Sequence, residues 1–176
     1  MEKIKTLKHR LGRFFKRHKT IREIVITIII LAVVYFTFMA VLMLALRTTT
    51  PLCAVISDSM KHNDNSWKTY FLDRGHDPSN FPFQGGFERG DLLIVRGVDA
   101  NDIAVGDVIV FQVPGRQELT HRVVEKREVD NQLLFITKGD ANRGPDSPSV
   151  KPEWIKGRAI FSIPKLGYIS LWLQRK

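Results

Sequence analysis

Two hydrophobic patterns divide this chain of 176 residues. The first is an unbroken run, because residues 24–46 are 23 uncharged and mostly apolar positions. As a helix that rises about 1.5 Å per residue, the run reaches about 34 Å, enough to cross a hydrocarbon core of about 30 Å. A cleavable secretory signal has a shorter apolar core and a small-residue cleavage site, whereas Arg47 and three threonines follow here. The pattern predicts one permanent transmembrane helix over 24–46.

The second pattern consists of short runs rich in β-branched residues within 47–176, a stretch long enough to bury its own core. Gly-Asp pairs at 90–91 and 106–107 introduce two of these runs, and the turn-forming pair at 130–131 separates two others, as in a hairpin. Strands at this close spacing, without helices between them, indicate a mainly β domain. The expected strands cover residues 92–95, 108–111, 119–129, 133–136 and 158–163.

Residues 61–89 depart from the strand pattern. Ser66 is placed to cap a short helix that carries Trp67 and Phe71 at helical spacing and ends at Gly75. A loop with three phenylalanines follows. Aromatic residues at this density either pack in the core or sit in the headgroup zone of a membrane, and the sequence leaves both open.

The positive charge of the chain is concentrated ahead of the apolar run. Residues 1–23 carry nine Lys and Arg against two Glu, a net charge of +7 out of +9 for the whole chain, which leaves +2 for the rest. By the positive-inside rule this basic arm stays in the cytoplasm and residues 47–176 lie outside it. We therefore interpret the arm as a topology signal that contacts lipid headgroups, and we expect no binding to nucleic acid.

A candidate reaction site comes from three places in the chain. Ser59 follows the apolar run by only 13 residues, so an extended link holds it at most about 45 Å from a bilayer. A serine hydroxyl needs a base to take its proton, and His121 is suited to that role. A carboxylate, Asp140 or Asp146, would orient the imidazole. Taken one at a time, each of these residues is better explained as an ordinary turn or strand residue than as a catalytic one.

We expect no cofactor and no metal ion. Cys53 is the single cysteine and has no motif partner, which is typical of a small buried residue. The polar residues His62, Asp64, His76 and Asp77 lack the tight ligand spacing of a zinc site.

Taken together, the motifs resemble those of type I signal peptidases over about residues 24–170. A membrane anchor precedes Ser-Asp-Ser-Met (57–60), a Gly-Asp pair with a valine-rich strand (106–111), His-Arg-Val (121–123), and Gly-Asp-Ala-Asn (139–142) with a second aspartate at 146. The resemblance implies a signal-peptidase-like, β-rich catalytic domain with a single N-terminal transmembrane helix. Bacterial members use a lysine where this chain has His121, so the chain is similar to the archaeal and endoplasmic-reticulum branch.

The resemblance also implies a role for each residue of the site. Ser59 would be the nucleophile and His121 the general base. Asp146 would orient the histidine, with Asp140 a second important acid that is either the orienting residue itself or structural. The backbone N–H of Ser59 and the hydroxyl of Ser57 would stabilise the oxyanion.

One departure from the family pattern lies directly after the nucleophile. Relatives reach the Gly-Asp strand soon after Ser-Met, whereas about 29 residues separate Met60 from Gly90 here, so 61–89 is an insertion. It could be a lid, a membrane-dipping element or a partner surface. We expect the walls of the substrate pocket to come from the residues beside Ser57 and from the strand 92–95.

The implied function is a serine endopeptidase of a cell membrane, or of the endoplasmic-reticulum membrane in a eukaryote. Its partners would be the signal peptides of exported preproteins, the lipid bilayer and, if it works in a complex, other subunits. Two alternatives stay open at this point. The domain could be a non-catalytic, membrane-anchored module that binds secretory clients or a peptidase complex, or it could process a narrower set of surface proteins.

Overall fold

The computed structural model of this chain describes residues 19–173. Most of the basic arm predicted over 1–23 lies outside the described residues, and its last residues belong to a helix. The chain divides into two compact units, Met1–Leu42 and Met43–Lys176. Each unit is described by itself.

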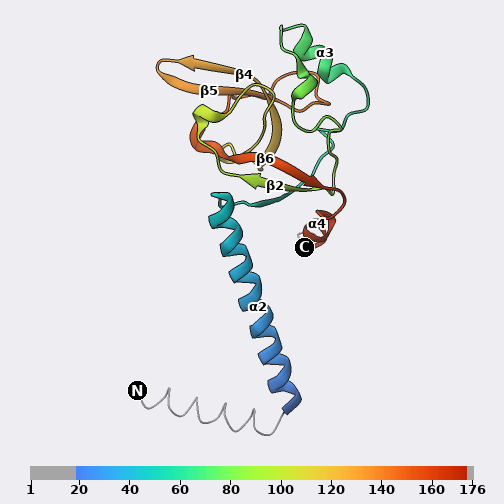
Figure 1. Cartoon of the computed structure of the whole chain (residues 1–176), viewed down its shortest axis with the longest axis vertical. Helices are drawn as coiled ribbons and strands as arrows, with labels where there is room; N and C mark the ends of the chain where they lie inside the picture. The colour runs from blue at the N-terminus through green and yellow to red at the C-terminus, as the bar shows by residue number, and fades with distance from the viewer. Residues whose placement is uncertain (1–18, 174–176) are drawn as a thin grey trace. The chain divides into compact units, whose positions relative to one another are not determined.

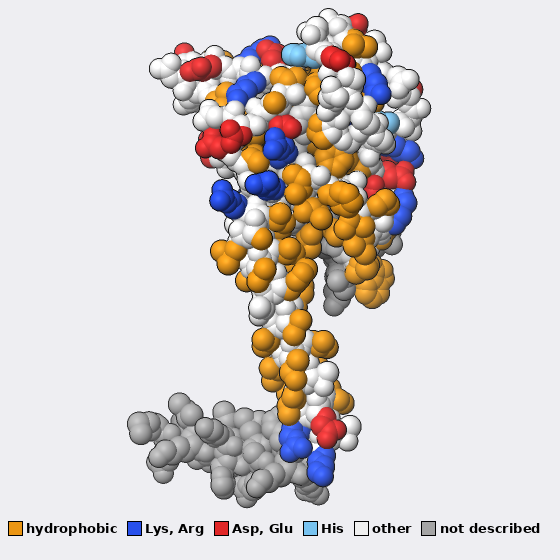
Figure 2. Space-filling model, viewed as in Figure 1, with side chains coloured by type: hydrophobic (Ala, Val, Ile, Leu, Met, Phe, Trp, Pro, Cys, Tyr) orange, Lys and Arg blue, Asp and Glu red, His pale blue; other side chains and the backbone are white. Residues whose placement is uncertain are grey.

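Helix α2, Lys19–Leu46, has 28 residues, none of them buried. Figure 2 shows apolar side chains along its length. It is long and apolar enough to cross a membrane, and it is the one such helix among residues 19–173. The helix begins at Lys19, ahead of the predicted start at residue 24. The mostly polar residues 19–23 are also helical, but they carry no hydrophobic pattern from which this could be predicted. It ends in a Schellman motif, in which Arg47 has a φ of 53° and the Thr48 N–H donates to the Met43 carbonyl at 3.2 Å.

The remaining chain forms one antiparallel six-stranded sheet with the order β1-β2-β6-β3-β4-β5 (Figure 1). The five predicted strands are confirmed, and a three-residue strand after the apolar run is an addition. The strands are β1 Leu52–Ala54, β2 Leu92–Arg96, β3 Val108–Phe111, β4 Leu119–Val129, β5 Gln132–Lys138 and β6 Ile155–Ile163.

The predicted hairpin is confirmed in β4 and β5. Val129 pairs with Gln132, so Asp130 and Asn131 form a two-residue turn with φ values of 51° and 59°. Both residues occupy the left-handed region that a type I′ turn requires, and Asp and Asn tolerate it better than other non-glycine residues. The turn fixes the register of β4, the strand that carries His121.

Both faces of the sheet are covered, as β3 shows most directly. All four residues of β3 are buried. Val108 and Val110 pack with Leu93 and Val95 of β2, whereas the next residues along β3, Ile109 and Phe111, pack in a second cluster with Val123 and Phe135. Because successive side chains of a strand point to opposite faces, the two clusters are cores on opposite sides of the sheet.

The insertion 61–89 folds back onto the domain through α3, Ser66–Leu72. Its Trp67 and Phe71 are buried and pack with Val124 of β4. These aromatic side chains therefore belong to the core and not to a membrane surface. The expectation that Ser66 caps the helix was wrong, because Asn65 is the N-cap and the Ser66 N–H donates to the Asp64 carboxylate at 2.8 Å.

The other described elements are short. They are the 3₁₀ turns η1 Pro78–Asn80, η2 Ala100–Asp102 and η3 Pro152–Trp154, and helix α4 Tyr168–Leu173.

Candidate active site

Ser59, His121 and Asp146 form one series of hydrogen-bond contacts. The Ser59 Oγ lies 3.0 Å from His121 Nε2, and His121 Nδ1 lies 2.6 Å from an Asp146 carboxylate oxygen. Ser59 follows β1, His121 is on β4, and Asp146 lies in the loop after β5, so three separate segments build the site. The His121 ring is buried, whereas the Asp146 side chain is 17% exposed.

The partners of the two ring nitrogens decide which one carries the proton. A carboxylate accepts hydrogen bonds, so His121 Nδ1 is the donor to Asp146. In the neutral ring this leaves the lone pair of Nε2 directed at Ser59, ready to accept from its hydroxyl. The arrangement prepares a proton transfer from Ser59 to His121.

Asp146 is held by Thr137, the penultimate residue of β5. The Thr137 hydroxyl donates to the same carboxylate oxygen that faces His121, at 2.7 Å, and the Asp146 N–H donates to the Thr137 carbonyl, also at 2.7 Å. Two bonds to one residue fix both the backbone and the carboxylate of Asp146. Sequence reasoning missed Thr137, since a strand threonine gives no signal of such a role.

Asp140 has a different environment from Asp146. Its carboxylate accepts from Arg122 Nη2 at 2.7 Å and from Arg122 Nε at 3.0 Å, and it lies 2.7 Å from His62 Nε2. Burial opposes its ionisation, but the hydrogen bonds from His62 and Arg122 outweigh burial and lower the pKa of Asp140 below its usual value. Of the two aspartates that the sequence left open, Asp146 is the one within hydrogen-bond distance of His121.

The loop after β5 also holds the backbone of Ser59. The Ala141 N–H donates to the Ser59 carbonyl at 2.8 Å. A Cβ on Gly139 would lie only 2.8 Å from the same oxygen, so the loop approaches this closely because residue 139 is glycine. Ser59 is thus positioned by a part of the chain about 80 residues away.

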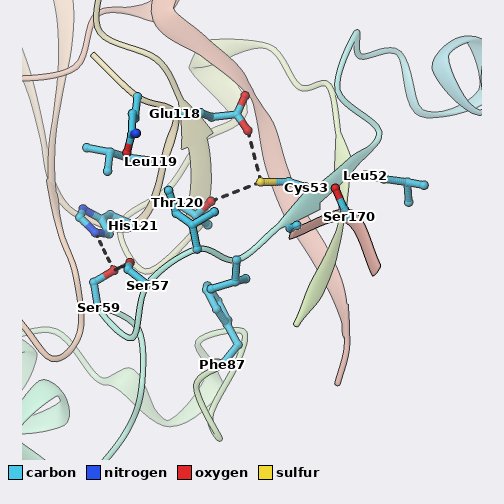
Figure 3. Close-up of a pocket in the computed structure, with 14 residues that line it drawn as sticks. Leu52, Cys53, Ser57, Ser59, Phe87, Glu118, Leu119, Thr120, His121 and Ser170 are labelled. Carbon is cyan, nitrogen blue, oxygen red and sulfur yellow. Dashed lines mark hydrogen bonds between the residues drawn. The ribbon is translucent and has the colours of Figure 1, made fainter. Parts of the chain in front are cut away.

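A cavity of about 350 Å³ opens beside Ser59 and His121. Its walls are the segment from Leu52 to Ser59 and the stretch from Gln117 to His121 (Figure 3). The expectation that strand 92–95 forms a wall was wrong. In the sheet, β1 separates β2 from the cavity, and the second wall is formed by the start of β4. The Ser57 hydroxyl lies at the catalytic end of the cavity, 3.1 Å from Ser59 Oγ.

The cavity also contains a second polar pair, Cys53 and Glu118. The Cys53 thiol donates to the Glu118 carboxylate at 3.3 Å, and Figure 3 shows the two side chains directed at each other. Burial, followed by the negative charge of Glu118, raises the pKa of Cys53 to about 12. The thiol is therefore protonated at neutral pH, and the expectation of a small buried cysteine is confirmed.

Lys138 is the lysine next to the Gly139 loop, and its amino group contacts backbone carbonyls of that loop and the Tyr70 ring. Its Nζ donates to the carbonyls of Gly139 and Asp140 and lies 4.9 Å from the centre of the Tyr70 ring. Burial lowers the pKa of Lys138. The base that faces Ser59 is His121. Within residues 19–173, no three His, Cys, Asp or Glu side chains group as metal ligands.

No protein-family model matches the chain, but curated proteins do. Signal peptidase complex catalytic subunit SEC11C of Homo sapiens is 35% identical over 94 residues, which cover 48% of this chain and 49% of that protein. SEC11 of Lachancea thermotolerans is 35% identical over 99 residues, 49% of this chain and 58% of that protein. SEC11 of Zygosaccharomyces rouxii is 30% identical over 147 residues, 75% of this chain and 85% of that protein. The chain thus spans about half the length of the first two relatives and most of the third.

Proposed function

Because this chain belongs to the type I signal peptidase family, we propose that it is a membrane-bound serine endopeptidase that removes signal peptides from exported preproteins. The observation that carries the proposal is the contact series from Ser59 through His121 to Asp146. A binding module that does no chemistry has no need of a base aligned on a serine hydroxyl. This arrangement therefore favours the enzyme over the non-catalytic alternative.

The chemistry follows from the proton positions. Ser59 Oγ attacks the scissile carbonyl while His121 Nε2 takes the hydroxyl proton, and Asp146 stabilises the imidazolium that forms. His121 then gives that proton to the leaving amine, which departs as the new N-terminus of the mature protein. Water, activated by the same histidine, hydrolyses the ester between Ser59 and the signal peptide and releases the enzyme.

Two donors are available for the oxyanion of the tetrahedral intermediate. The first is the backbone N–H of Ser59, and the second is the Ser57 hydroxyl, which lies 3.1 Å from the attacking oxygen and so next to the reacting carbonyl. Loss of one such donor costs about 10²- to 10³-fold in turnover. Ser57→Ala is expected to cause a loss in this range without unfolding the domain.

The cavity suits an extended peptide. Along its walls β1 is paired with β2, the start of β4 is paired with β3, and β5 joins β4 from Arg122 onward. Each wall thus presents a strand edge that lacks a strand partner among the described residues. A peptide can add to such an edge through main-chain hydrogen bonds, with its side chains in the cavity between the walls. Signal peptides have small residues at the cleavage site.

Helix α2 would anchor this site at the membrane in which the substrates lie. With the basic arm in the cytoplasm, the catalytic domain is on the opposite side, where signal-peptide cleavage sites emerge. Other subunits are proposed partners because the relatives are named as subunits of a complex.

Cleavage of a preprotein by the purified full-length protein in detergent tests the proposal. The wild type is expected to release one signal peptide by hydrolysis at a single bond, measured by mass spectrometry of both products. Ser59→Ala and His121→Ala are expected to abolish release while circular dichroism remains unchanged. Two matched controls remove an exposed serine and an exposed histidine, Ser79→Ala and His76→Ala, and should retain full activity.

Full activity in either active-site variant would overturn the serine mechanism. A wild type that binds the preprotein without cleaving it would favour the non-catalytic alternative. Cleavage of surface-protein precursors with rejection of general preproteins would favour the narrower peptidase.

A further inference from the structure

His62 lies three residues after the nucleophile and outside the contact series that contains it. Its side chain is only 8% exposed and lies in the insertion, stacked on the Trp67 ring at 4.6 Å. Both ring nitrogens face oxygen acceptors. Nε2 lies 2.7 Å from the Asp140 carboxylate, and Nδ1 lies 3.0 Å from the Gln84 carbonyl oxygen. The ring thus links the insertion to the loop after β5.

An oxygen lies at each of the two ring nitrogens. A carboxylate accepts hydrogen bonds, so His62 Nε2 is the donor to Asp140. The same carboxylate also accepts from the fully buried Arg122. These contacts hold the His62 ring between the insertion and the loop after β5.

The loop after β5 and the insertion, which His62 links, both bind the backbone or side chain of Ser59 and Met60. On the side of Asp140, the Ala141 N–H binds the Ser59 carbonyl at 2.8 Å, and the Asp140 N–H binds the Met60 sulfur at 3.4 Å. On the side of Gln84, the Phe87 N–H binds the Met60 carbonyl at 3.2 Å. The His62 side chain lies between these two sides and contacts both.

The fit around the ring is close. A Cβ on Gly86 would lie 2.9 Å from the His62 ring, so the insertion approaches the ring as closely as a glycine permits. Arg122 binds both sides as well, because its Nη1 donates to the Pro82 carbonyl of the insertion at 2.7 Å.

We propose that His62 is a positioning residue for Ser59: its ring fastens the insertion 61–89 to the Gly139–Asn142 loop and so sets the geometry of the nucleophile. The proposal rests on the proposed function, since it concerns the rate of that reaction. Loss of the donor to Asp140 loosens the insertion. Misplacement of a reacting group by about 1 Å can cost about 10²-fold in rate.

Other charged groups face the ring from the elements around it, and most of them are engaged elsewhere. Two small cavities adjoin His62, and apart from Asp140 the charged residues that line them are Lys61, Asp64, Glu88, Asp91 and Lys165. Glu88 is paired with both lysines. Asp64 and Asp91 accept from backbone N–H groups. The carboxylate bonded to the described His62 ring is that of Asp140.

Two variants of His62 separate positioning from simple packing. In His62→Gln, the side-chain amide reaches about as far as Nε2 and donates to Asp140. In His62→Asn, the shorter amide reaches only the level of Nδ1 and leaves Asp140 without this donor.

His62→Gln should keep kcat within about threefold of the wild type. His62→Asn should lower kcat by about 10- to 100-fold with an unchanged KM. All rates are measured at a temperature at which circular dichroism shows every variant folded. Wild-type kcat in His62→Asn, or a loss in His62→Gln as large as in His62→Asn, would overturn the proposal.

A second measurement does not depend on activity. In the ¹⁵N-alanine-labelled full-length protein in micelles, the Ala141 amide signal should be displaced in His62→Asn and lie near its wild-type position in His62→Gln. If the wild type cleaves no preprotein, the proposed function fails, yet the amide signal still decides whether His62 is coupled to the Ser59 loop. An Ala141 signal at the wild-type position in His62→Asn would overturn the coupling.

Discussion

At the residue scale, the two aspartates of the site have separate tasks. Asp146 faces His121, whereas Asp140 neutralises the buried Arg122. Asp146→Asn is expected to lower turnover by about 10⁴-fold, because an amide no longer favours the proton on Nδ1, with little change in stability. Asp140→Asn is expected to lower the free energy of unfolding by about 3–5 kcal/mol, because it leaves a buried cation without its partner. Urea unfolding and preprotein cleavage, measured on both variants, test these two predictions. A large loss of turnover in Asp140→Asn together with a large loss of stability in Asp146→Asn would reverse the roles of the two aspartates.

The lowered pKa of Asp140 also predicts how stability depends on acid. A carboxyl group whose pKa is lower in the folded than in the unfolded protein stabilises the fold above the unfolded pKa. This contribution is lost as the pH falls through the folded value. We therefore expect the free energy of unfolding to decrease from about pH 4 downward, and to decrease less in Asp140→Asn. Urea titrations between pH 7 and pH 3 measure the difference, and parallel curves for the two proteins would contradict the prediction.

Cys53 allows a chemical test of the cavity. Its pKa of about 12 keeps the thiol protonated, and the thiolate is the form that reacts with alkylating reagents. We expect iodoacetamide at pH 8 to modify native Cys53 far more slowly than the same thiol in the urea-unfolded protein. Mass spectrometry over time gives both rates, and equal rates would show that Cys53 is not in the environment described.

At the scale of elements, the loop after β5 contributes to the position of Ser59, in addition to the strands of the sheet. Gly139→Ala places a Cβ 2.8 Å from the Ser59 carbonyl oxygen, so either the loop or the nucleophile must move. We expect turnover to fall by about 10²-fold with the sheet intact. Gly144→Ala is the matched control, because a Cβ there meets nothing within 4 Å. Equal effects of the two substitutions would show that the close approach does not position Ser59.

The elements also show what the sequence could predict. Strands β2 to β6 and the β4–β5 hairpin followed from β-branched runs and turn residues, because those signals are local. β1 was missed because three residues after a proline are too few for a pattern. The mistaken Ser66 cap has a related cause, since several neighbouring polar residues could cap α3 and only the backbone conformation distinguishes them.

The candidate site was predictable only where its residues lie in motifs. Ser59, His121 and the two aspartates were named from the sequence, but it did not decide between the aspartates. That choice depends on how the chain after β5 turns back to Thr137. His62 gave no signal of its role because its partner Asp140 is 78 residues away.

At the scale of the whole molecule, the orientation in the membrane is a testable prediction of the charge distribution. In a Cys53→Ser background, a cysteine at the exposed position of Glu128 should react with a membrane-impermeant maleimide added outside sealed right-side-out vesicles. A cysteine in place of Thr6, on the basic arm, should react only after detergent is added. The reverse pattern would place the catalytic domain in the cytoplasm.

The division of the site among three segments has a consequence for when the proposed peptidase would become active. Ser59 precedes His121 by 62 residues and Asp146 by a further 25, so a growing chain exposes its hydroxyl long before the groups that activate it. A chain that stops short of Thr137 and Asp146 has a serine of ordinary, low reactivity. In the proposed mechanism, hydrolytic activity therefore arises late in synthesis, once the segments that carry His121 and Asp146 have been made.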